Sequence, residues 1–168
     1  DLARKLQEIC PGDLECSFLA NSGSEAVDTA LKLARLHTGK PKIVCAQKSF
    51  HGYTFGALSA SGFPAFKRLF QPLVPEIVHV PFGDLPALAQ AVDQDTAAVL
   101  LEPLQHEGGV HAPDASYLCD AGRLCADNGA VFILDEIKTG LGKTGDWFAC
   151  QKSRVVPDIL LLGKALGG

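Results

Sequence analysis

The stretch Ala130-Val-Phe-Ile-Leu-Asp135-Glu136 is a short apolar run that ends in two carboxylates. Similar runs recur along the chain at residues 16–20, 42–46, 76–80, 97–101 and 158–162. The lengths of these runs, and the Val and Ile content of several of them, predict buried strands. In the stretch quoted above, the predicted strand covers residues 130–134.

Stretches with helical periodicity lie between the predicted strands. Helices are predicted at residues 25–37, 84–92 and 117–128, with Gly39 and Gly129 among the signals that stop them. Repeated alternation of strands and helices predicts an α/β fold, in which a mostly parallel sheet carries helices on both faces. Ligands of such folds bind at the carboxyl ends of the strands, so we expect function in the loops that follow them.

The composition fits a globular domain. The chain has 168 residues, of which 47% are hydrophobic and 20% charged, and its formal net charge is -4. This apolar fraction is enough for a core, and no Lys/Arg cluster points to nucleic acid or an anionic membrane as a partner. The longest uncharged apolar runs, at residues 97–101 and 159–162, are too short to cross a bilayer.

The cysteines and the termini give two further expectations. Six cysteines occur without a CxxC pair, which favours reduced thiols and a cytoplasmic location. The chain opens on a charged amphipathic segment rather than a secretory signal. It also starts without Met and ends on two glycines, so we expect both ends to be cut edges of a longer protein.

The motif Asn21-Ser-Gly-Ser-Glu-Ala26 lies between a predicted strand and a long predicted helix. Ser22 followed three residues later by Glu25 predicts a capping box, and Gly23 allows close approach to the backbone. The free N–H groups and the dipole of a helix start suit a phosphate group. A plain helix cap is the alternative interpretation.

Asp135 follows a strand with no other charge. A carboxylate buried there needs a positive or protonated partner, for which a metal ion and a protonated ring nitrogen are the two candidates. His106 and His111 flank Glu107, but their spacing is not that of the helical HExxH motif, and no other set of ligands has a recognisable spacing. We therefore predict no metal.

Lys164 follows an apolar strand and precedes another small apolar step. This setting predicts a partly desolvated amine with a lowered pKa, able to form a Schiff base, whereas a solvated surface lysine is the alternative. A phosphate site, a strand-end aspartate and such a lysine are together the three anchors that pyridoxal phosphate needs.

Five motifs in this order and spacing resemble the class III pyridoxal-phosphate aminotransferases, which include the ornithine, acetylornithine, putrescine and 4-aminobutyrate enzymes. The motifs are Asn21-Ser-Gly-Ser-Glu-Ala26, Ser49-Phe-His-Gly52, Glu102-Pro-Leu-Gln-His-Glu-Gly-Gly109, Leu134-Asp-Glu-Ile-Lys-Thr-Gly-Leu-Gly-Lys-Thr-Gly145 and Leu162-Gly-Lys-Ala-Leu-Gly-Gly168. The resemblance covers essentially the whole chain. It implies that residues 1–168 are an incomplete pyridoxal-phosphate-binding large domain, a three-layer sandwich without its N-terminal segment and C-terminal small domain. It also implies a homodimer with active sites at the subunit interface.

The resemblance assigns roles to the matching positions. It implies that Asp135 pairs with the ring nitrogen of the cofactor and that Lys164 forms the Schiff base and shuttles a proton. The implied phosphate and ring contacts come from Ser22, Gly23, Ser24, Phe50 and His51, with Phe50 stacking on the ring and His51 beside it.

Four further positions in the motifs concern the substrate side and departures from the family pattern. The resemblance places Glu102 and Glu107 on the substrate side. Lys138 stands where the family usually has a glutamine that bonds the cofactor 3-hydroxyl, and His106 stands where it usually has glycine. A lysine at position 138 could still donate a hydrogen bond to that oxygen.

The function that the resemblance implies is transfer of an amino group from an amine or omega-amino acid to a 2-oxo acid. An aminomutase or racemase of the same fold is an alternative that keeps the cofactor. A non-catalytic α/β module that binds phosphate is an alternative of another class, and the behaviour of Lys164 separates it from the enzymes.

Overall fold

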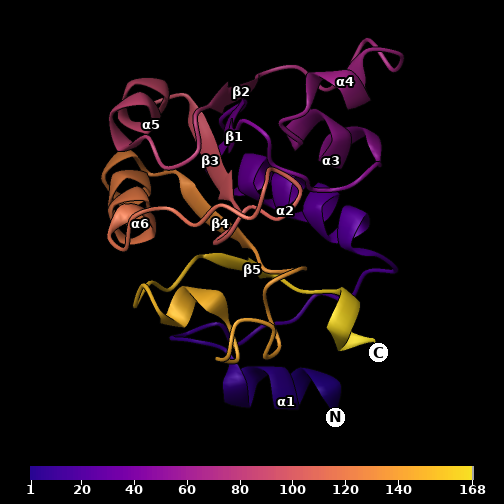
Figure 1. Cartoon of the computed structure of the whole chain (residues 1–168), viewed down its shortest axis with the longest axis vertical. Helices are drawn as coiled ribbons and strands as arrows, with labels where there is room; N and C mark the ends of the chain where they lie inside the picture. The colour runs from indigo at the N-terminus through magenta and orange to yellow at the C-terminus, as the bar shows by residue number, and fades with distance from the viewer. Residues whose placement is uncertain (168) are drawn as a thin grey trace.

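One parallel sheet lies at the centre of the computed structural model, which describes residues 1–167 (Figure 1). Within that range the sheet has five strands in the order β2-β1-β3-β4-β5, and each neighbouring pair is parallel. The strands are β1 (Lys42–Ala46), β2 (Ile77–Val80), β3 (Thr96–Leu101), β4 (Val131–Asp135) and β5 (Ile159–Leu161). Five of the six predicted strands are therefore confirmed, with shifts of at most one residue at their ends.

The strand predicted at residues 16–20 is wrong. These residues form no regular structure and are all exposed, Phe18 by 73%. A strand needs a neighbour for its N–H and C=O groups, and among the described residues no strand lies beside this run.

The helices follow the periodic stretches of the sequence. Helices α2 (Gly23–Thr38), α5 (Leu85–Ala91) and α6 (Tyr117–Asn128) confirm the three predicted helices. The others in the described chain are α1 (Leu2–Ile9), α3 (Phe55–Ala60), α4 (Pro64–Lys67) and the 3-10 helices η1 (Ala149–Gln151) and η2 (Lys164–Leu166). Gly39 and Gly129 end α2 and α6 with φ values of 69° and 59°, in the left-handed region that favours glycine.

The helices cover the sheet in two layers (Figure 1). Helices α2 and α3 lie on one face, and α5 and α6 lie on the other. Successive side chains of β4 alternate between these faces, because Val131 and Ile133 pack with α2 whereas Phe132 and Leu134 pack with α5 and α6. The predicted three-layer α/β fold is confirmed.

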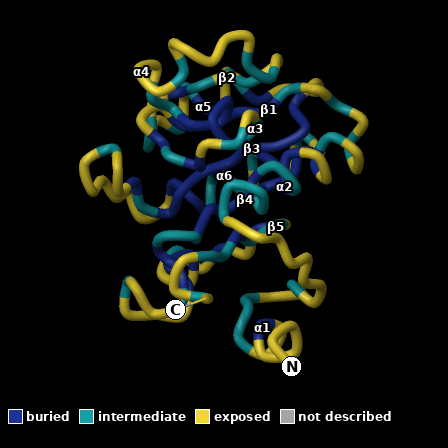
Figure 2. The backbone as a smooth tube through the Cα atoms, turned by 90° about the vertical axis from the view of Figure 1, so that its right-hand side faces the viewer, coloured by how far each residue is buried: buried dark blue, intermediate teal, exposed yellow. Residues whose placement is uncertain are grey.

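Burial follows the same plan (Figure 2). Every residue of β3 and β4 is buried, whereas α1 and many connecting loops carry exposed residues. Within residues 1–167, no helix combines the length and the apolar character needed to span a membrane. Gly168, which ends the last sequence motif, lies outside the described residues.

Candidate active site

A cavity of about 180 Å³ lies where the strands reach their carboxyl ends. Its lining includes all ten residues that the sequence predicted for the site: Ser22, Gly23, Ser24, Phe50, His51, Glu102, Glu107, Asp135, Lys138 and Lys164. Gly52 and Ile137 complete it. Residues from distant parts of the chain thus meet at one place, while their individual roles stay predictions.

The first turn of α2 brings unpaired N–H groups to this cavity. Ser22 is the N-cap, and its Oγ accepts a hydrogen bond of 3.2 Å from the N–H of Glu25. The Glu25 carboxylate in turn accepts a 2.8 Å bond from the N–H of Asn21, so this carboxylate lies against the chain that enters the helix. In the described chain the N–H groups of Gly23 and Ser24 have no partner, and they are free to bind an anion.

The side chain of Ser24 is used by the protein itself. Its Oγ accepts a 3.2 Å bond from the N–H of Tyr53, and its carbonyl accepts a 3.3 Å bond from Thr54 Oγ1. Gly52 sits against this serine with a φ of 127°, and a Cβ there would overlap the Ser24 hydroxyl. The loop with Phe50 and His51 is therefore fixed directly to the start of α2.

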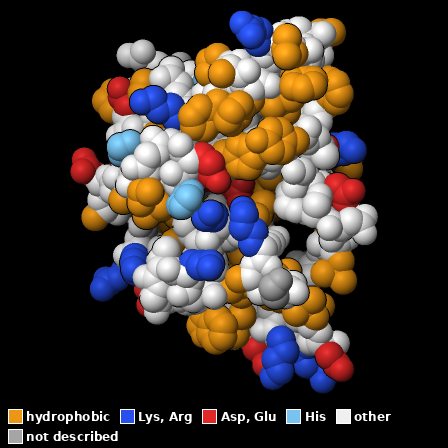
Figure 3. Space-filling view, turned by 45° about the vertical axis from the view of Figure 1, so that its right-hand side comes forward, with side chains coloured by type: hydrophobic (Ala, Val, Ile, Leu, Met, Phe, Trp, Pro, Cys, Tyr) orange, Lys and Arg blue, Asp and Glu red, His pale blue; other side chains and the backbone are white. Residues whose placement is uncertain are grey.

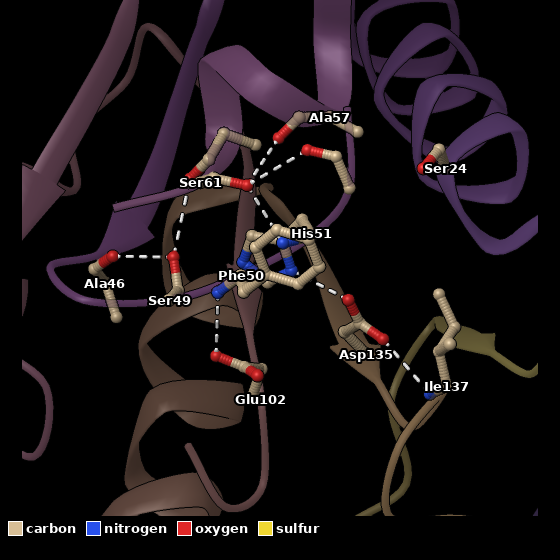
Figure 4. Close-up of polar contacts among 12 residues, drawn as sticks. Ser24, Ala46, Ser49, Phe50, His51, Ala57, Ser61, Glu102, Asp135 and Ile137 are labelled. Atoms are coloured by element: carbon tan, nitrogen blue, oxygen red, sulfur yellow. Dashed lines mark hydrogen bonds and ion pairs between the residues drawn. The ribbon is translucent and has the colours of Figure 1, made fainter. Parts of the chain in front are cut away.

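Asp135 is paired with a histidine that the sequence had placed only beside the cofactor ring. His51 Nδ1 lies 2.7 Å from Asp135 Oδ2, and both residues are at least 96% buried (Figure 4). A bond to a carboxylate requires the proton on Nδ1. Asp135 Oδ1 accepts a 3.0 Å bond from the N–H of Ile137, which holds the carboxylate from its other side.

This pair was missed because nothing local in the sequence indicates it. The two residues are 84 positions apart, and His51 precedes a glycine in a short loop. The only signal was the inferred need of a buried Asp135 for a protonated partner. His51 Nε2 is buried and has no hydrogen-bond partner in the described chain.

Glu102 follows β3 and supports the same loop. It is 4% exposed, and its Oε2 accepts a 3.3 Å bond from the N–H of Phe50 (Figure 4). Burial raises the pKa of Glu102 to about 7, with the charges of Asp135 and Glu107 adding to the rise and that of His51 opposing it. Near neutral pH this carboxyl group therefore exists in both its protonated and its ionised form.

Glu107 lies on a loop closed by a short bridge between Gln105 and His111. The loop is fixed to the chain after β1 by Gln105, whose Nε2 donates a 2.8 Å bond to the Gln47 carbonyl. His106, the residue in place of the family glycine, is half-exposed with its Nδ1 3.8 Å from Glu107 Oε1. The side chain of His106 is thus directed towards the Glu107 carboxylate.

Lys138 and Lys164 bring two amines to the cavity. Lys138 is half-buried and Lys164 is exposed, while partial desolvation of the Lys164 amine stays a prediction. Lys164 follows β5 and has a φ of 45°. Neither amine has a hydrogen-bond or ion-pair partner within residues 1–167.

Glu136, the second carboxylate after β4, does not reach the cavity. It is 1% exposed and accepts three bonds of 2.8 Å, from Thr139 Oγ1 and from the N–H groups of Ala149 and Cys150. The two carboxylates follow each other at the end of the strand, and the alternation of side chains directs them to opposite faces of the sheet.

Other features of the described chain do not compete with this site. A larger groove of about 590 Å³ lies at the opposite ends of β4 and β5, but its lining is mainly apolar and includes no lysine or arginine. Among residues 1–167, no cluster of three or more His, Cys, Asp or Glu side chains could hold a metal ion.

Known proteins match both the sequence and the fold. The family model for class III aminotransferases matches residues 1–168. Acetylornithine aminotransferase of Methanopyrus kandleri is 48% identical over 168 residues, which are all of this chain and 43% of that protein. Putrescine aminotransferase of Pectobacterium atrosepticum is 49% identical, across 99% of this chain and 38% of that protein.

Solved structures agree. A transaminase from the marine bacterium Virgibacillus superposes with a TM-score of 0.92 at 31% identity, covering 99% of this chain and 42% of its own. An ornithine aminotransferase from Toxoplasma gondii superposes with a TM-score of 0.81 at 36% identity, covering 85% of this chain and 36% of its own. That structure holds pyridoxal phosphate at partial occupancy in its active site. The chain spans less than half the length of these relatives. On the match of the family model to its whole length, the chain belongs to the class III aminotransferase family.

Proposed function

We propose that the natural full-length protein is a pyridoxal-phosphate-dependent aminotransferase. Its reaction would move an amino group from an amine or omega-amino acid, of the ornithine, acetylornithine or putrescine type, to a 2-oxo acid. The observation that carries this proposal is the meeting of an unpaired amine, a buried carboxylate and unpaired helix N–H groups in one cavity. Residues 1–168 would then be part of the cofactor-binding large domain.

The cavity fits the chemistry of the cofactor. Pyridoxal phosphate offers a phosphate, a basic ring nitrogen and an aldehyde. The N–H groups of Gly23 and Ser24 suit the phosphate, Asp135 suits the protonated nitrogen, and Lys164 suits the aldehyde. Phe50 is half-buried in the lining and offers an aromatic ring for stacking.

Asp135 has a hydrogen-bond donor at each of its carboxylate oxygens. The Ile137 N–H and the ring of His51 each donate to one oxygen, which holds the carboxylate in one orientation. Asp135 would keep a proton on the cofactor nitrogen, and His51 would position Asp135. When bound, the cofactor supplies an electron sink that stabilises negative charge at the substrate α-carbon.

Lys164 would hold the aldehyde covalently, and its amine, once displaced by a substrate amine, would move a proton between the substrate α-carbon and the cofactor carbon, first as a base and then as an acid. Lys138 would donate a hydrogen bond to the phenolic oxygen of the cofactor. Glu102 and Glu107 would face the substrate, where their carboxylates favour a second positive group on the amino donor.

The remaining proposals concern assembly and location. The segment around α3 and α4 exposes large apolar side chains, and Figure 3 shows hydrophobic side chains gathered on the upper part of one face, above neighbouring basic, acidic and histidine side chains. These exposed residues include Tyr53, Phe55 and Leu69. They support a homodimer, which analytical ultracentrifugation of the full-length protein would test.

The six free cysteines support a cytoplasmic location. We propose neither a nucleic-acid partner nor a membrane partner.

The test uses the two amines of the cavity as a matched pair. Full-length protein is incubated with pyridoxal phosphate, reduced with borohydride, digested and analysed by mass spectrometry. We expect the cofactor on Lys164, no covalent cofactor in Lys164→Ala, and normal attachment in Lys138→Ala. Attachment that survives Lys164→Ala would contradict the proposal.

Activity separates the enzymes that share this cofactor. Wild-type protein is given putrescine, ornithine, acetylornithine or 4-aminobutyrate, with or without a 2-oxo acid. A transaminase turns over only when a 2-oxo acid accepts the amino group, whereas an aminomutase or racemase needs no acceptor. A non-catalytic module would give no turnover under any condition.

A further inference from the structure

The ring of Phe50 is held by an aromatic cluster that lies mostly outside the cavity. Tyr53 meets Phe50 edge-on, with ring centroids 5.1 Å apart and an interplanar angle of 69°. Phe66 also meets it edge-on, at 6.3 Å and 88°. Phe66 in turn contacts Tyr53 at 6.3 Å and Phe63 at 5.1 Å. All four separations lie in the range in which aromatic pairs attract each other.

Phe66 belongs to α4, a helix of four residues. A single helical turn is not stable by itself, so α4 must be held by its surroundings. The next residue, Lys67, supplies this hold, because its Nζ donates a 2.7 Å bond to the Ser59 carbonyl at the end of α3. His79 Nε2 lies 3.2 Å from the same Nζ and 2.9 Å from the Ala60 carbonyl.

The end of α3 supports the cavity loop as well. Ser61 follows α3, and its Oγ accepts a 2.9 Å bond from the N–H of His51 (Figure 4). The Lys67 anchor at Ser59 and the His51 anchor at Ser61 are thus two residues apart on one short segment. Phe50 and Phe66 are attached to the same support, which fixes their relative position.

We propose that Phe66 is a positioning residue, which sets the tilt of the Phe50 ring for a flat aromatic ligand in the cavity. The inference rests on the proposed function, in which that ligand is pyridoxal phosphate. The physical basis is that two edge-on contacts, from Tyr53 and Phe66, limit how the Phe50 ring can rotate. A ring fixed in advance loses less conformational freedom when the ligand stacks on it.

The test compares Phe66→Leu with Phe66→Tyr and with Phe70→Leu in the full-length protein. Phe66→Leu keeps apolar bulk but removes the ring, and Phe66→Tyr keeps the ring. Phe70, 51% exposed, makes no ring contact with the cluster in the described chain and provides the matched control. The measurements are the dissociation constant of pyridoxal phosphate by equilibrium dialysis and the circular dichroism of its bound absorption band.

We expect Phe66→Leu to weaken cofactor binding by about 2- to 10-fold, the effect of one aromatic contact, and to reduce the dichroism per bound cofactor. Phe66→Tyr should restore both values, and Phe70→Leu should match the wild type. Lys67→Met, which removes the anchor of α4 without touching the cluster, should act in the same direction. This second variant keeps the test decisive if Phe66→Leu does not fold.

Three results would overturn the inference. In the first, Phe66→Leu and Lys67→Met bind the cofactor as the wild type does, with the same dichroism. In the second, Phe70→Leu weakens binding as much as Phe66→Leu. In the third, the loss of affinity accompanies dissociation of an oligomer in size-exclusion chromatography. Wild-type protein that fails to bind the cofactor would instead refute the proposed function, and this inference with it.

Discussion

Asp135 and Glu136 are neighbours in the chain but lie in two different regions of the molecule. Asp135 faces the α2 side of the sheet, where it borders a cavity and has His51 and one backbone N–H as partners. Glu136 faces the other side, where three donors within residues 139–150 enclose it. Both carboxylates are buried, so burial alone does not distinguish them.

The two carboxylates differ in whether groups of the protein fill all of the space around them. The donors around Glu136 come from the protein, so its carboxylate stabilises the fold and has little capacity left for a ligand. Asp135 borders open space next to unpaired N–H groups and amines, an arrangement that a ligand can complete. A buried acidic residue is therefore a candidate for function when part of its surroundings remains unfilled.

The largest expected effect is on the Glu136 side. Glu136→Ala leaves three buried donors without an acceptor, and we expect the free energy of unfolding to fall by about 3–5 kcal/mol. Urea denaturation measures this, with Glu8→Ala on exposed α1 as a control that should change stability little. A variant as stable as the wild type would show that Glu136 is not a structural carboxylate.

The next effect is on the Asp135 side, and it should appear in binding rather than in stability. Asp135→Asn keeps an acceptor for the Ile137 N–H but removes the charge, and we expect about 100-fold weaker pyridoxal phosphate binding, or ~3 kcal/mol. Asp28→Asn is the control, because Asp28 also accepts a backbone N–H, from Ala57, but does not line the cavity. Equal cofactor binding by Asp135→Asn and the wild type would contradict the idea that Asp135 serves ligand binding whereas Glu136 serves the fold.

The smallest effect concerns Glu102, a third buried carboxyl group. Its pKa is about 7 in the folded chain against an ordinary 4.5, so the folded chain binds this proton more tightly than the unfolded chain. The contribution of Glu102 to the free energy of unfolding therefore falls as the pH rises from about 4.5 to 7. Glu102→Gln stays neutral and can still accept the Phe50 N–H, so this pH-dependent fall in the free energy of unfolding should be absent from the variant.

We expect Glu102→Gln and the wild type to be equally stable near pH 4 and the variant to be more stable by about 1–2 kcal/mol at pH 8, in the absence of cofactor. Urea denaturation at both pH values measures the difference. A variant that is less stable than the wild type at pH 8 would show that the ionised carboxylate is favoured in this position.

The sequence was informative where a pattern is local. Helix α2 and strand β4 were predicted because each repeats one apolar pattern over enough residues to fix its type. The run at residues 16–20 has the same apolar character as a strand, but strand formation depends on a neighbour that its own residues do not specify. Helix α4 was missed because its four residues make only about one helical turn, which is too short for an apolar pattern to repeat.

The site could be predicted as a set of residues but not as a set of contacts. The sequence identified ten of the twelve lining residues, because each lies near the end of a strand or the start of a helix. The His51–Asp135 pair depends on how two loops meet across 84 positions, and the exposure of Lys164 depends on where the backbone turns after β5. Both are properties of the assembled chain.

The three bonds to Glu136 have a consequence for how far this chain can be altered. Residues 139 and 149–150, which flank a mostly exposed stretch, are tied to one carboxylate. Replacing residues 142–146 by a longer segment would then change chiefly the entropy of a loop whose base is already closed, a cost of ~0.6 kcal/mol for each doubling of length. We therefore expect this loop to accept a peptide tag or a reporter domain while Asp135 keeps its place.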